Sequence, residues 1–484
     1  MQRKLRREWQ RTIAQFVLSR SIVNAPKQRR ARRRWRRAMI KILLPQIAAT
    51  GILLSTYGLC LAEPNGGQVT AGQGAIGSDG NTTTITQNSD KMVIDWQSFN
   101  IGFGETVQFI QPGKNAIALN RILGNSASSI YGSLLANGKI FLINPNGILF
   151  GSTAQIDVGG LVASTLNLSD SDFLAGNYTF DANGAYGSVV NRGEILAADG
   201  GYVVLVGAQV RNDGVLAAEN GTVALAAGDR VTLDFNGDGL LGLAVDRGTL
   251  SALVENQSLV EADGGKVIMT ARAADDLAGT VVNNSGVVRA QSINQVDGVI
   301  ILDGGVNGTT LNSGTLDASG KDAGEPGGTV KMLGENVGLT GGSLIDVSGN
   351  QGGGTVLVGG NFQGKGPEQN ATATYIGANA VIDADALSNG NGGRVAVWGD
   401  EATRFYGTIV AQGGSLSGNG GMVETSGAYL EAAGKVDAGA NNGSAGSWLL
   451  DPDSITIQDS GSDTNVGSSP NFISSATNAV LTTG

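Results

Sequence analysis

Short segments in which apolar and polar residues alternate recur along the chain beyond about residue 187. Each segment has four to six residues and is rich in Val, Leu, Ile and Thr, and turns of Asn-Gly, Asp-Gly and Gly-Gly separate the segments. Alternation with a period of two indicates β-strands, and these dipeptides are typical of tight turns. The pattern predicts an all-β chain whose repeating part has no helical period.

One pattern returns at fixed spacing. Its first copy is Asn191–Ala198, and a glycine turn and a second apolar run, Gly200–Leu205, follow it. Further copies begin at four asparagines: Asn212, Asn256, Asn284 and Asn312. The first two copies are 21 residues apart and the last three are 28 apart. Units of this length with two or three short strands fit the coils of a parallel β-helix, in which stacked units share one core.

Two other architectures fit less well. Leucine-rich repeats have a similar length, but their Leu-x-x-Leu-x-Leu pattern is absent. An antiparallel sandwich would not need a fixed repeat phase. We therefore predict a right-handed parallel β-helix, with a capped N-terminal region where residues 63–180 repeat less clearly.

Composition narrows the chemistry. The chain has 484 residues, with 76 Gly, 9 Pro, no His and one Cys, and 41% of its residues are hydrophobic, which is too apolar for disorder. Without His, and with Cys60 as the single thiol, no soft metal site or thiol–imidazole nucleophile is expected. We predict no cofactor and no enzymatic activity, and the fold must hold together without disulfides.

Charge is distributed unevenly. Residues 1–41 hold 15 of the 32 Lys and Arg residues and one acid, Glu8. Residues 63–484 therefore carry 17 basic and 41 acidic residues, a net charge of 17 − 41 = −24. A body this acidic repels nucleic acid, so no nucleic-acid partner is expected.

The N-terminus has the layout of an extended signal peptide over residues 1–62. A basic stretch precedes an apolar run, and the small residues Cys60 and Ala62 stand before Glu63. We predict cleavage between Ala62 and Glu63 by signal peptidase after export through the inner-membrane secretion machinery. The apolar run is short and contains Pro45, which argues against a permanent anchor.

Two segments carry a family resemblance. The first is Met92–Gly102, with the order Asp-Trp-x-x-Phe-Asn-Ile-Gly, and the second is Gly138–Gly151, with Asn-Pro-Asn-Gly-Ile at its centre. Together they resemble the secretion domain of two-partner exoproteins, the filamentous haemagglutinin family. Trp448–Pro452 also looks like a downstream element of large members.

The resemblance implies a secreted or surface-exposed adhesin of a Gram-negative bacterium that passes through the periplasm. Its partner would be an outer-membrane transporter with periplasmic polypeptide-transport-associated domains, bound by β-augmentation. A host-cell or surface glycan is the candidate ligand. We expect a signal peptide (1–62), a two-partner secretion domain (63–310), further β-helical repeats (311–447), and the truncated start of a downstream region (448–484).

Residue roles follow in part from this resemblance. The candidate partner-recognition motif is Asn144, Pro145, Asn146, Gly147 and Ile148. The same residues also form a good turn, because Pro suits the first central position and Asn and Gly tolerate positive φ. The two interpretations stay open. The flanking Ile143 and the aromatic residues Trp96, Phe99 and Phe109 are expected in the core.

Three alternatives compete with an adhesin that binds no metal. Asp234, Asn236 and Asp238 alternate like the oxygen ligands of a calcium loop, but the twelfth position is Val245, not Glu. The chain could also be the delivery stalk of a contact-dependent inhibition toxin, whose N-terminal region would look the same. A β-helical polysaccharide-active enzyme is disfavoured, because we find no acidic or basic cluster that recurs on one face of adjacent coils.

Overall fold

The structure is a computed structural model that describes residues 63–235, 240–249, 252–274, 280–293 and 296–452. The predicted signal peptide, including Ala62, and residues 453–484 lie outside the described residues. Among the described residues, no helix is both long and apolar enough to cross a membrane.

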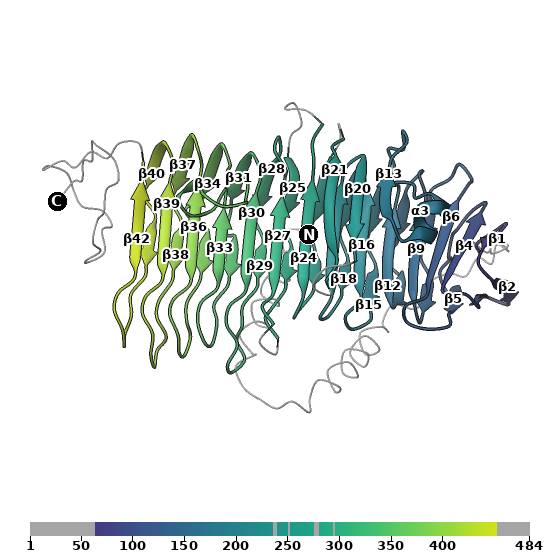
Figure 1. The fold of residues 1–484 in the computed structure, drawn as a ribbon, viewed down its shortest axis with the longest axis horizontal. Helices are drawn as coiled ribbons and strands as arrows, with labels where there is room; N and C mark the ends of the chain where they lie inside the picture. The colour runs from purple at the N-terminus through teal and green to yellow at the C-terminus, as the bar shows by residue number, and fades with distance from the viewer. Residues whose placement is uncertain (1–62, 236–239, 250–251, 275–279, 294–295, 453–484) are drawn as a thin grey trace, which may run out of the picture. The chain divides into compact units, whose positions relative to one another are not determined.

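Strands in three long sheets make up most of the described chain (Figure 1). The first sheet contains β1 (Gln68–Ala71), β4 (Lys91–Trp96), β6 (Ile117–Ile122), β9 (Lys139–Ile143), β12 (Gly160–Ser164), β16 (Tyr202–Gly207), β19 (Thr222–Ala227), β24 (Lys266–Ala271), β27 (Val299–Asp303), β30 (Thr329–Leu333), β33 (Thr355–Val358), β36 (Arg394–Trp398), β39 (Met422–Ser426) and β42 (Ser447–Asp451). The second sheet contains β7 (Ser128–Ile130), β10 (Ile148–Phe150), β14 (Ser188–Asn191), β17 (Gln209–Asn212), β22 (Leu253–Asn256), β25 (Thr280–Asn284), β28 (Thr309–Asn312), β31 (Asn336–Leu339), β34 (Ala373–Ile376), β37 (Ala402–Phe405) and β40 (Tyr429–Ala432). The third sheet contains β2 (Gly74–Asp79), β3 (Thr82–Gln87), β5 (Thr106–Ile110), β8 (Ser133–Ala136), β11 (Gln155–Val158), β15 (Glu194–Ala197), β18 (Val215–Ala217), β23 (Leu259–Glu261), β26 (Val287–Arg289), β29 (Thr315–Asp317), β32 (Leu344–Asp346), β35 (Val381–Asp383), β38 (Thr408–Val410) and β41 (Lys435–Asp437).

The chain visits the three sheets in a fixed order. β16 lies in the first sheet, β17 in the second and β18 in the third, and β19 then returns to the first sheet in parallel beside β16. Each strand therefore pairs with its counterpart one coil earlier and one coil later. This is the predicted parallel β-helix, and the sequence-based expectation of the fold class is confirmed.

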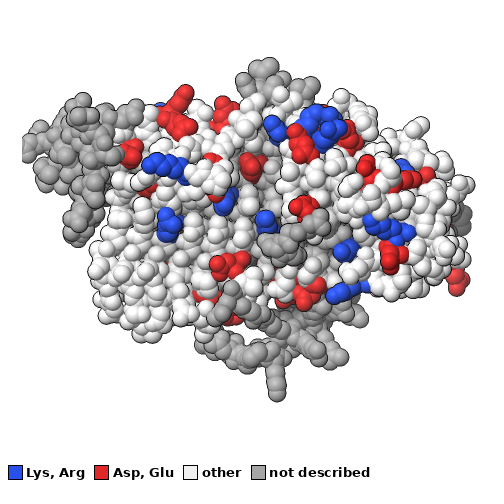
Figure 2. All heavy atoms as spheres, in the orientation of Figure 1, with Lys and Arg blue, Asp and Glu red and all other residues white. Residues whose placement is uncertain are grey.

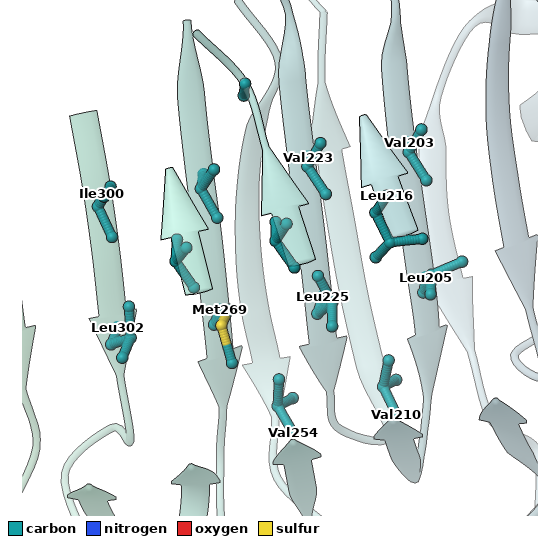
Figure 3. Packing of buried hydrophobic residues seen from close by; sticks show 14 of the residues in the cluster. Val203, Leu205, Val210, Leu216, Val223, Leu225, Val254, Met269, Ile300 and Leu302 are labelled. Carbon is teal, nitrogen blue, oxygen red and sulfur yellow. The ribbon is translucent and has the colours of Figure 1, made fainter. Parts of the chain in front are cut away.

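The core lies inside the coil, where all three sheets contribute (Figure 3). In one coil, Val203 and Leu205 come from β16, Val210 from β17 and Leu216 from β18, and each is at most 1% exposed. The next coil adds Val223 and Leu225 in register with the first pair. Each coil thus buries its apolar residues against its neighbours, because a coil alone would leave both of its edges in water.

The N-terminal end departs from parallel pairing. β1 runs antiparallel to β4, and β2 forms an antiparallel pair with β3. From β4 and β3 onward, the long sheets are parallel. The antiparallel strands cover the first coil, whose edge would otherwise offer unpaired backbone groups. The predicted N-terminal cap is present.

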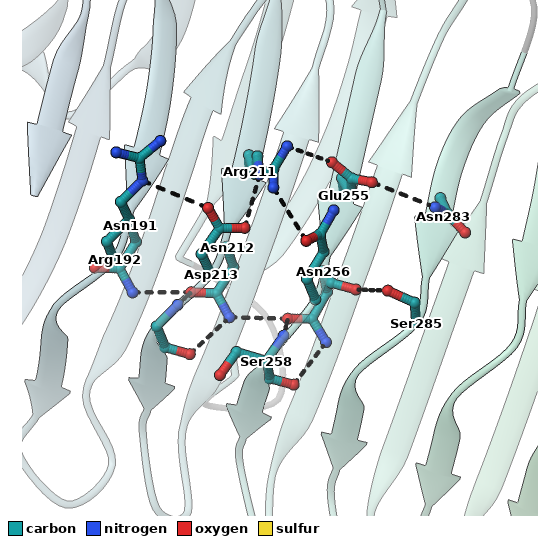
Figure 4. A network of polar contacts seen from close by, with 12 residues as sticks. Asn191, Arg192, Arg211, Asn212, Asp213, Glu255, Asn256, Ser258, Asn283 and Ser285 are labelled. Atoms are coloured by element: carbon teal, nitrogen blue, oxygen red, sulfur yellow. Dashed lines mark hydrogen bonds and ion pairs between the residues drawn. The ribbon is translucent and has the colours of Figure 1, made fainter. Parts of the chain in front are cut away.

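The repeating asparagines form a ladder at the corner between the second and third sheets (Figure 4). Its rungs are five fully buried side chains: Asn191, Asn212, Asn256, Asn284 and Asn312. In each step the Nδ2 donates to the Oδ1 of the next rung, and all four distances are 2.8 Å. Each Oδ1 of the first three rungs also accepts the backbone N–H two residues ahead. An amide carries a donor and an acceptor, so a stack of amides satisfies itself without charge.

An insertion explains the irregular spacing of the ladder. Asn212 and Asn256 are 44 residues apart in sequence although their side chains are adjacent. The extra residues include β20 (Arg230–Asp234) and β21 (Gly242–Arg247), which pair antiparallel outside the coil. β13 (Tyr178–Asp181) joins them to form a small three-stranded sheet.

The small sheet and the helix α3 (Asp170–Ala175) cover the outer face of the first sheet. Phe141 points outward from β9 and packs against Phe173 of α3 and Phe180 of β13, with ring centroids 5.9 and 6.2 Å away. Lys91 on β4 donates to the last carbonyls of α3, at Phe173 (2.8 Å) and Leu174 (2.9 Å). A second apolar core therefore lies outside the coil.

This second core corrects one expectation. We expected strands with apolar and polar residues in alternation, and β14 and β17 of the second sheet follow that pattern. Every residue of β12, β16 and β19 is buried, because both faces of the first sheet are covered there. The continuous apolar runs were the sequence signal for a covering layer.

Replacing Asn256 with Ala should remove one rung of the ladder. Asn212 Nδ2 would lose its shortest acceptor and keep only the carbonyls of Gly214 and Leu259, both at 3.2 Å. Oδ1 of Asn284 would lose a donor, and the N–H of Ser258 would lose its side-chain partner. We expect a loss of about 3 kcal/mol in unfolding free energy, because buried polar groups are left unpaired. Chemical denaturation measures the loss, and hydrogen exchange should locate it at β22 and β25.

Asn283 offers a matched control on the same strand as Asn284. Its side chain is only partly buried and makes one long contact, 3.5 Å from Glu255. Asn283→Ala should change stability by less than about 0.5 kcal/mol. Equal losses in the two variants would contradict the structural role of the ladder.

Candidate partner-recognition site

The predicted motif forms the turn between β9 and β10. The N–H of Gly147 donates to the carbonyl of Asn144 at 3.0 Å, which closes a four-residue turn around Pro145 and Asn146. Gly147 has a φ of +117°, and a Cβ at that position would lie 3.2 Å from the carbonyl oxygen of Ser188. Glycine is favoured here by both the backbone angle and the close approach of the next coil.

Asn144 is fully buried and holds the turn against the preceding coil. Its Nδ2 donates to the carbonyl of Ser126 and to Oγ of Ser128, both at 3.0 Å. Its Oδ1 accepts the backbone N–H and the Nδ2 of Asn146, at 3.0 and 3.2 Å. The side chain has a complete set of partners inside the protein, so in the folded state it is not accessible to another molecule.

Asn146 is the one member of the five-residue motif that is exposed. Its Nδ2 donates to the carbonyl of Gly124 at 2.9 Å. Pro145 beside it is partly buried, and Ile148 is 2% exposed and belongs to the inner core. Ile143 is also buried, as expected, but it points to the outer core. Any contact of the folded motif with a partner must be made through Asn146 and Pro145.

Asn146 and Pro145 line a surface groove of about 560 Å³. The remaining lining residues are Arg121, Ile122, Leu123, Asn167, Ala182, Asn183, Gly184, Ala185 and Tyr186. Leu123 and Tyr186 are 54% and 75% exposed, which is unusual for such large apolar side chains. Neither position stood out in the sequence, because a single apolar residue in a loop gives no periodic signal.

The guanidinium of Arg121, at one side of the groove, is paired with acidic residues of the protein. Its guanidinium contacts Asp95 at 3.3 Å, forms an ion pair with Asp170 and donates to the carbonyl of Leu168 at 2.9 Å. The cation is therefore neutralised within the protein and ties β6 to the start of α3. The groove offers amide groups and two exposed apolar side chains, a mixture suited to a peptide or protein surface rather than to catalysis.

The aromatic residues of the first sequence segment, and Phe109 shortly after it, are structural, as expected. Trp96, Phe99 and Phe109 are at most 2% exposed. Trp96 packs edge-on against Phe99 at 5.4 Å and donates its Nε1–H to Oδ1 of Asn120 at 3.0 Å. The buried indole thus has a polar partner one coil away.

The candidate calcium residues are only partly covered by the structure. Asp234 is the last residue of β20, whereas Asn236 and Asp238 lie outside the described residues. Within the described parts of the chain, no group of three or more His, Cys, Asp or Glu side chains is arranged to hold a metal ion. Calcium binding at Asp234 stays a prediction.

The expectation that no acidic cluster recurs on adjacent coils was wrong. Asp317, Asp346 and Asp383 occupy the same register position in three successive coils of the third sheet. Val410 takes this position in the next coil and Asp437 in the one after. We call these four acids the aspartate column. Sequence reasoning missed it because the loops between the acids differ in length.

The aspartate column closes turns. Each carboxylate accepts the backbone N–H two residues ahead, at distances of 2.9 to 3.1 Å. Asp346 also accepts from Oγ of Ser348 and forms an ion pair with Lys321 at 2.7 Å. The carboxylates are committed to backbone donors, as expected for Asx turns, which gives no support to a two-acid hydrolase centre.

Asp385 lies next to the aspartate column and is electrostatically strained. Burial is the main cause that raises its pKa to about 6, and the negative charge of Asp383 adds to it, whereas a hydrogen bond from the N–H of Gln412 opposes the rise. Burial likewise raises the pKa of Asp383. Burial, with a smaller contribution from neighbouring carboxylates, thus favours the protonated forms of Asp383 and Asp385.

Positive and negative side chains are mixed on the face of the molecule drawn in Figure 2. On the face drawn in Figure 2, Lys and Arg side chains lie among Asp and Glu side chains rather than in a basic stripe. One example is Arg211, which contacts Asp213 at 2.7 Å and Glu255 at 3.3 Å (Figure 4). The expected absence of a nucleic-acid partner stays a prediction.

A capped parallel β-helix with a covered outer face, and an Asn-Pro-Asn-Gly-Ile turn beside a surface groove, define a two-partner secretion exoprotein. Residues 62–321 match the TPS secretion domain family, and the chain belongs to it.

Relatives agree with this assignment. The chain is 32% identical over 257 residues to a heme/hemopexin-binding protein of Haemophilus influenzae strain Rd. The aligned residues cover 51% of this chain and 28% of that protein. A second heme/hemopexin-binding protein of Haemophilus influenzae is 31% identical over 242 residues, 45% of this chain and 26% of the relative. The chain thus spans about a quarter of the length of these curated relatives.

A solved structure agrees as well. The crystal structure of the HMW1 secretion domain from Haemophilus influenzae superposes with a TM-score of 0.69 at 33% identity. The match covers 80% of this chain and all of that domain.

The raised pKa of Asp385 predicts how the stability of the protein depends on pH. Its folded-state pKa lies above the ordinary Asp value, so the folded state is favoured while the carboxyl is protonated, and stability is lost as the pH rises from about 4 through 6. Asp385→Asn should therefore raise the melting temperature at pH 7 to 8 and leave it almost unchanged near pH 4. Thermal denaturation across this range measures the difference. The exposed Asp157→Asn on the same sheet controls for the change in net charge, and a pH-independent difference for Asp385→Asn would contradict the assignment.

Proposed function

We propose that this chain is the export-directing N-terminal region of an adhesin-type exoprotein. The observation that carries the proposal is the TPS secretion domain match over residues 62–321, together with the groove beside Asn146. The partner is an outer-membrane transporter with periplasmic polypeptide-transport-associated domains. The motif Asn144–Ile148 directs the chain to that partner.

The motif serves two steps with different residues. While the chain is unfolded, the whole segment is accessible and can add as a strand to a partner sheet. After folding, Asn144 and Ile148 become part of the interior, and Asn146 with Pro145 stays at the surface. The same short segment thus offers recognition before folding and a firm turn afterwards.

The route and the domain division follow from this proposal. Residues 1–62 act as a signal peptide that is cut between Ala62 and Glu63, and the chain crosses the periplasm to the cell surface or medium of a Gram-negative bacterium. Residues 63–310 form the secretion domain and residues 311–447 extend the β-helix. Residues 448–484 begin a downstream region.

Adhesion, rather than catalysis, is the role that the folded surface favours. The aspartate column is bonded to backbone N–H groups, and the chain contains no His. A surface glycan is the candidate ligand of the mature protein. A toxin-delivery stalk would share these features, and a growth-inhibition assay of neighbouring cells distinguishes it from an adhesin.

The names of the relatives indicate a narrower activity than adhesion. Both are named heme/hemopexin-binding proteins, but this chain matches about a quarter of their length. Histidine is a common axial ligand of haem iron, and the present sequence has none.

Secretion with a transporter tests the proposal. The full chain is expressed in a Gram-negative host with and without a two-partner outer-membrane transporter, and the culture fluid is assayed. We expect secretion only with the transporter. Asn146→Ala should reduce it roughly fivefold, because one hydrogen-bonding contact worth about 1 kcal/mol is lost from the encounter.

Asn220→Ala is the matched control. Asn220 precedes a glycine in another exposed turn and bonds Asp199 at 2.7 Å, so its loss should not change secretion. Strand content by circular dichroism verifies that both variants fold. Equal secretion of wild type and a folded Asn146→Ala variant would remove the recognition role of the motif.

A further inference from the structure

A strap crosses the outer face of the first sheet beyond the small sheet. It comprises residues Asn361–Asn370 between β33 and β34 and includes the short 3₁₀ turn η2 (Phe362–Gly364). The N–H of Gln363 donates to both oxygens of the buried Glu424 on β39, each at 3.1 Å. The guanidinium of Arg394 on β36 stacks on the ring of Phe362 at 4.4 Å. The strap is thus fixed over two later coils.

The other end of the strap is held by one carboxylate that two side chains contact. Lys331 projects from β30, and its Nζ lies 2.7 Å from Oε1 of Glu368. Nδ2 of Asn361 lies 2.6 Å from Oε2 of the same carboxylate. The side chain of Glu368 is 8% exposed and that of Lys331 is 29% exposed. One largely buried acid therefore holds an amine on one oxygen and a carboxamide on the other.

The carboxamide is also polarised from its other side. The backbone N–H of Phe362 donates to Oδ1 of Asn361 at 2.8 Å. Gly366 has a φ of +129°, and a Cβ there would lie 2.6 Å from Nδ2 of Asn361 and 3.0 Å from Oε2 of Glu368. The glycine allows the backbone to lie directly against the amide–carboxylate contact.

These groups have the roles needed for acyl transfer from an amide. Lys331 supplies a nucleophile, Glu368 a proton carrier that touches both the nucleophile and the leaving nitrogen, and the Phe362 N–H a donor to the carbonyl oxygen. We propose that Lys331 and Asn361 join through an intramolecular amide bond, with Glu368 as the proton carrier.

The step balances without a co-reactant. Glu368 accepts one proton from the Lys331 ammonium, and Nζ attacks Cγ of Asn361. The new Cγ–Nζ bond forms while the carbonyl oxygen becomes an oxyanion next to the Phe362 N–H. Protons from Nζ pass through Glu368 to Nδ2, the Cγ–Nδ2 bond breaks, and the nitrogen leaves as ammonium. Nothing is oxidised or reduced, and no water is consumed.

The electrostatics set the starting state for the first proton transfer. Burial acts to raise the pKa of Glu368, but hydrogen bonds from Lys331 and Asn361 bring it below its ordinary value. The carboxylate is therefore ionised and can accept a proton at neutral pH.

An amide bond at this position would fasten the strap to the first sheet. The single Cys in the sequence is Cys60, so the body of the chain has no disulfide available to fasten a crossing segment. An amide bond between Lys331 and Asn361 would close a loop of 30 residues and limit the unfolded chain in the same way as a disulfide. The bond would form only after folding brings β30 and the strap together.

Intact mass spectrometry of the full chain tests this inference. We expect the folded wild-type protein to be lighter by one ammonia than the mass calculated for the residues it retains, and trypsin digestion to give a branched peptide that joins Lys331 to Asn361. Lys331→Arg keeps a cation beside Glu368 but lacks the nucleophile, and Glu368→Gln keeps the shape but lacks the base. Both variants should have their full mass.

Lys365 on the same strap supplies a matched control. It contacts Gln363 at 3.1 Å and is exposed, so Lys365→Arg should still lose ammonia and give the branched peptide. Circular dichroism verifies that each variant is folded. A folded wild-type protein at full mass would overturn the inference, because Lys331 and Glu368 would then form only an ion pair. Ammonia loss without the branched peptide would overturn it too, and a crosslink that persists in Glu368→Gln would remove the role of the acid.

Discussion

Each coil is held by the coil beside it, through parallel strand pairing and through side chains that complete a shared interior. No single coil has a core of its own, since Val203, Leu205, Val210 and Leu216 need the layers on either side to be excluded from water. Loss of one layer therefore weakens its two neighbours. The antiparallel cap at β1 to β3 matters for the same reason, because it closes the end from which the parallel stack begins.

The two corners that bound the third sheet are built from polar stacks with different consequences. The asparagine ladder is neutral, and each interior amide donates to the next rung and accepts from the preceding one. The aspartate column repeats the same turn-closing bond with carboxylates, which repel one another when stacked. Lys321 beside Asp346, and Val410 in place of an acid, relieve this repulsion only in part. Burial is the main cause of the raised pKa values of Asp383 and Asp385, and the repulsion between neighbouring carboxylates adds to it.

Segments distant in sequence cover the outer face of the first sheet. β13 pairs with β20 about fifty residues later, and Gln363 binds Glu424 across 61 residues. The small sheet cannot pair until β20 is present, and the strap cannot bind Glu424 until β39 is present. The coils beneath them need only the adjacent coils. A chain that emerges from its N-terminus would thus form its coils first and fasten them afterwards, which suits folding outside the cell.

Alternation with a period of two, the turn dipeptides and the recurring asparagines were enough to predict the β-helix, because these features are local and repeat in phase. The buried Trp96, Phe99 and Phe109 were also predictable, since large apolar side chains in strands seldom remain exposed. The role of Asn144 and Asn146 was not, because one turn sequence can be buried or exposed, and only the neighbouring coil decides which. The aspartate column, the groove with Leu123 and Tyr186, and the meeting of Lys331, Asn361 and Glu368 depend on contacts between segments separated by loops of unequal length. Sequence by itself determined the repeating unit, because its physics lies within one coil. The tertiary structure decided which side chains meet, because register between coils is fixed only when they stack.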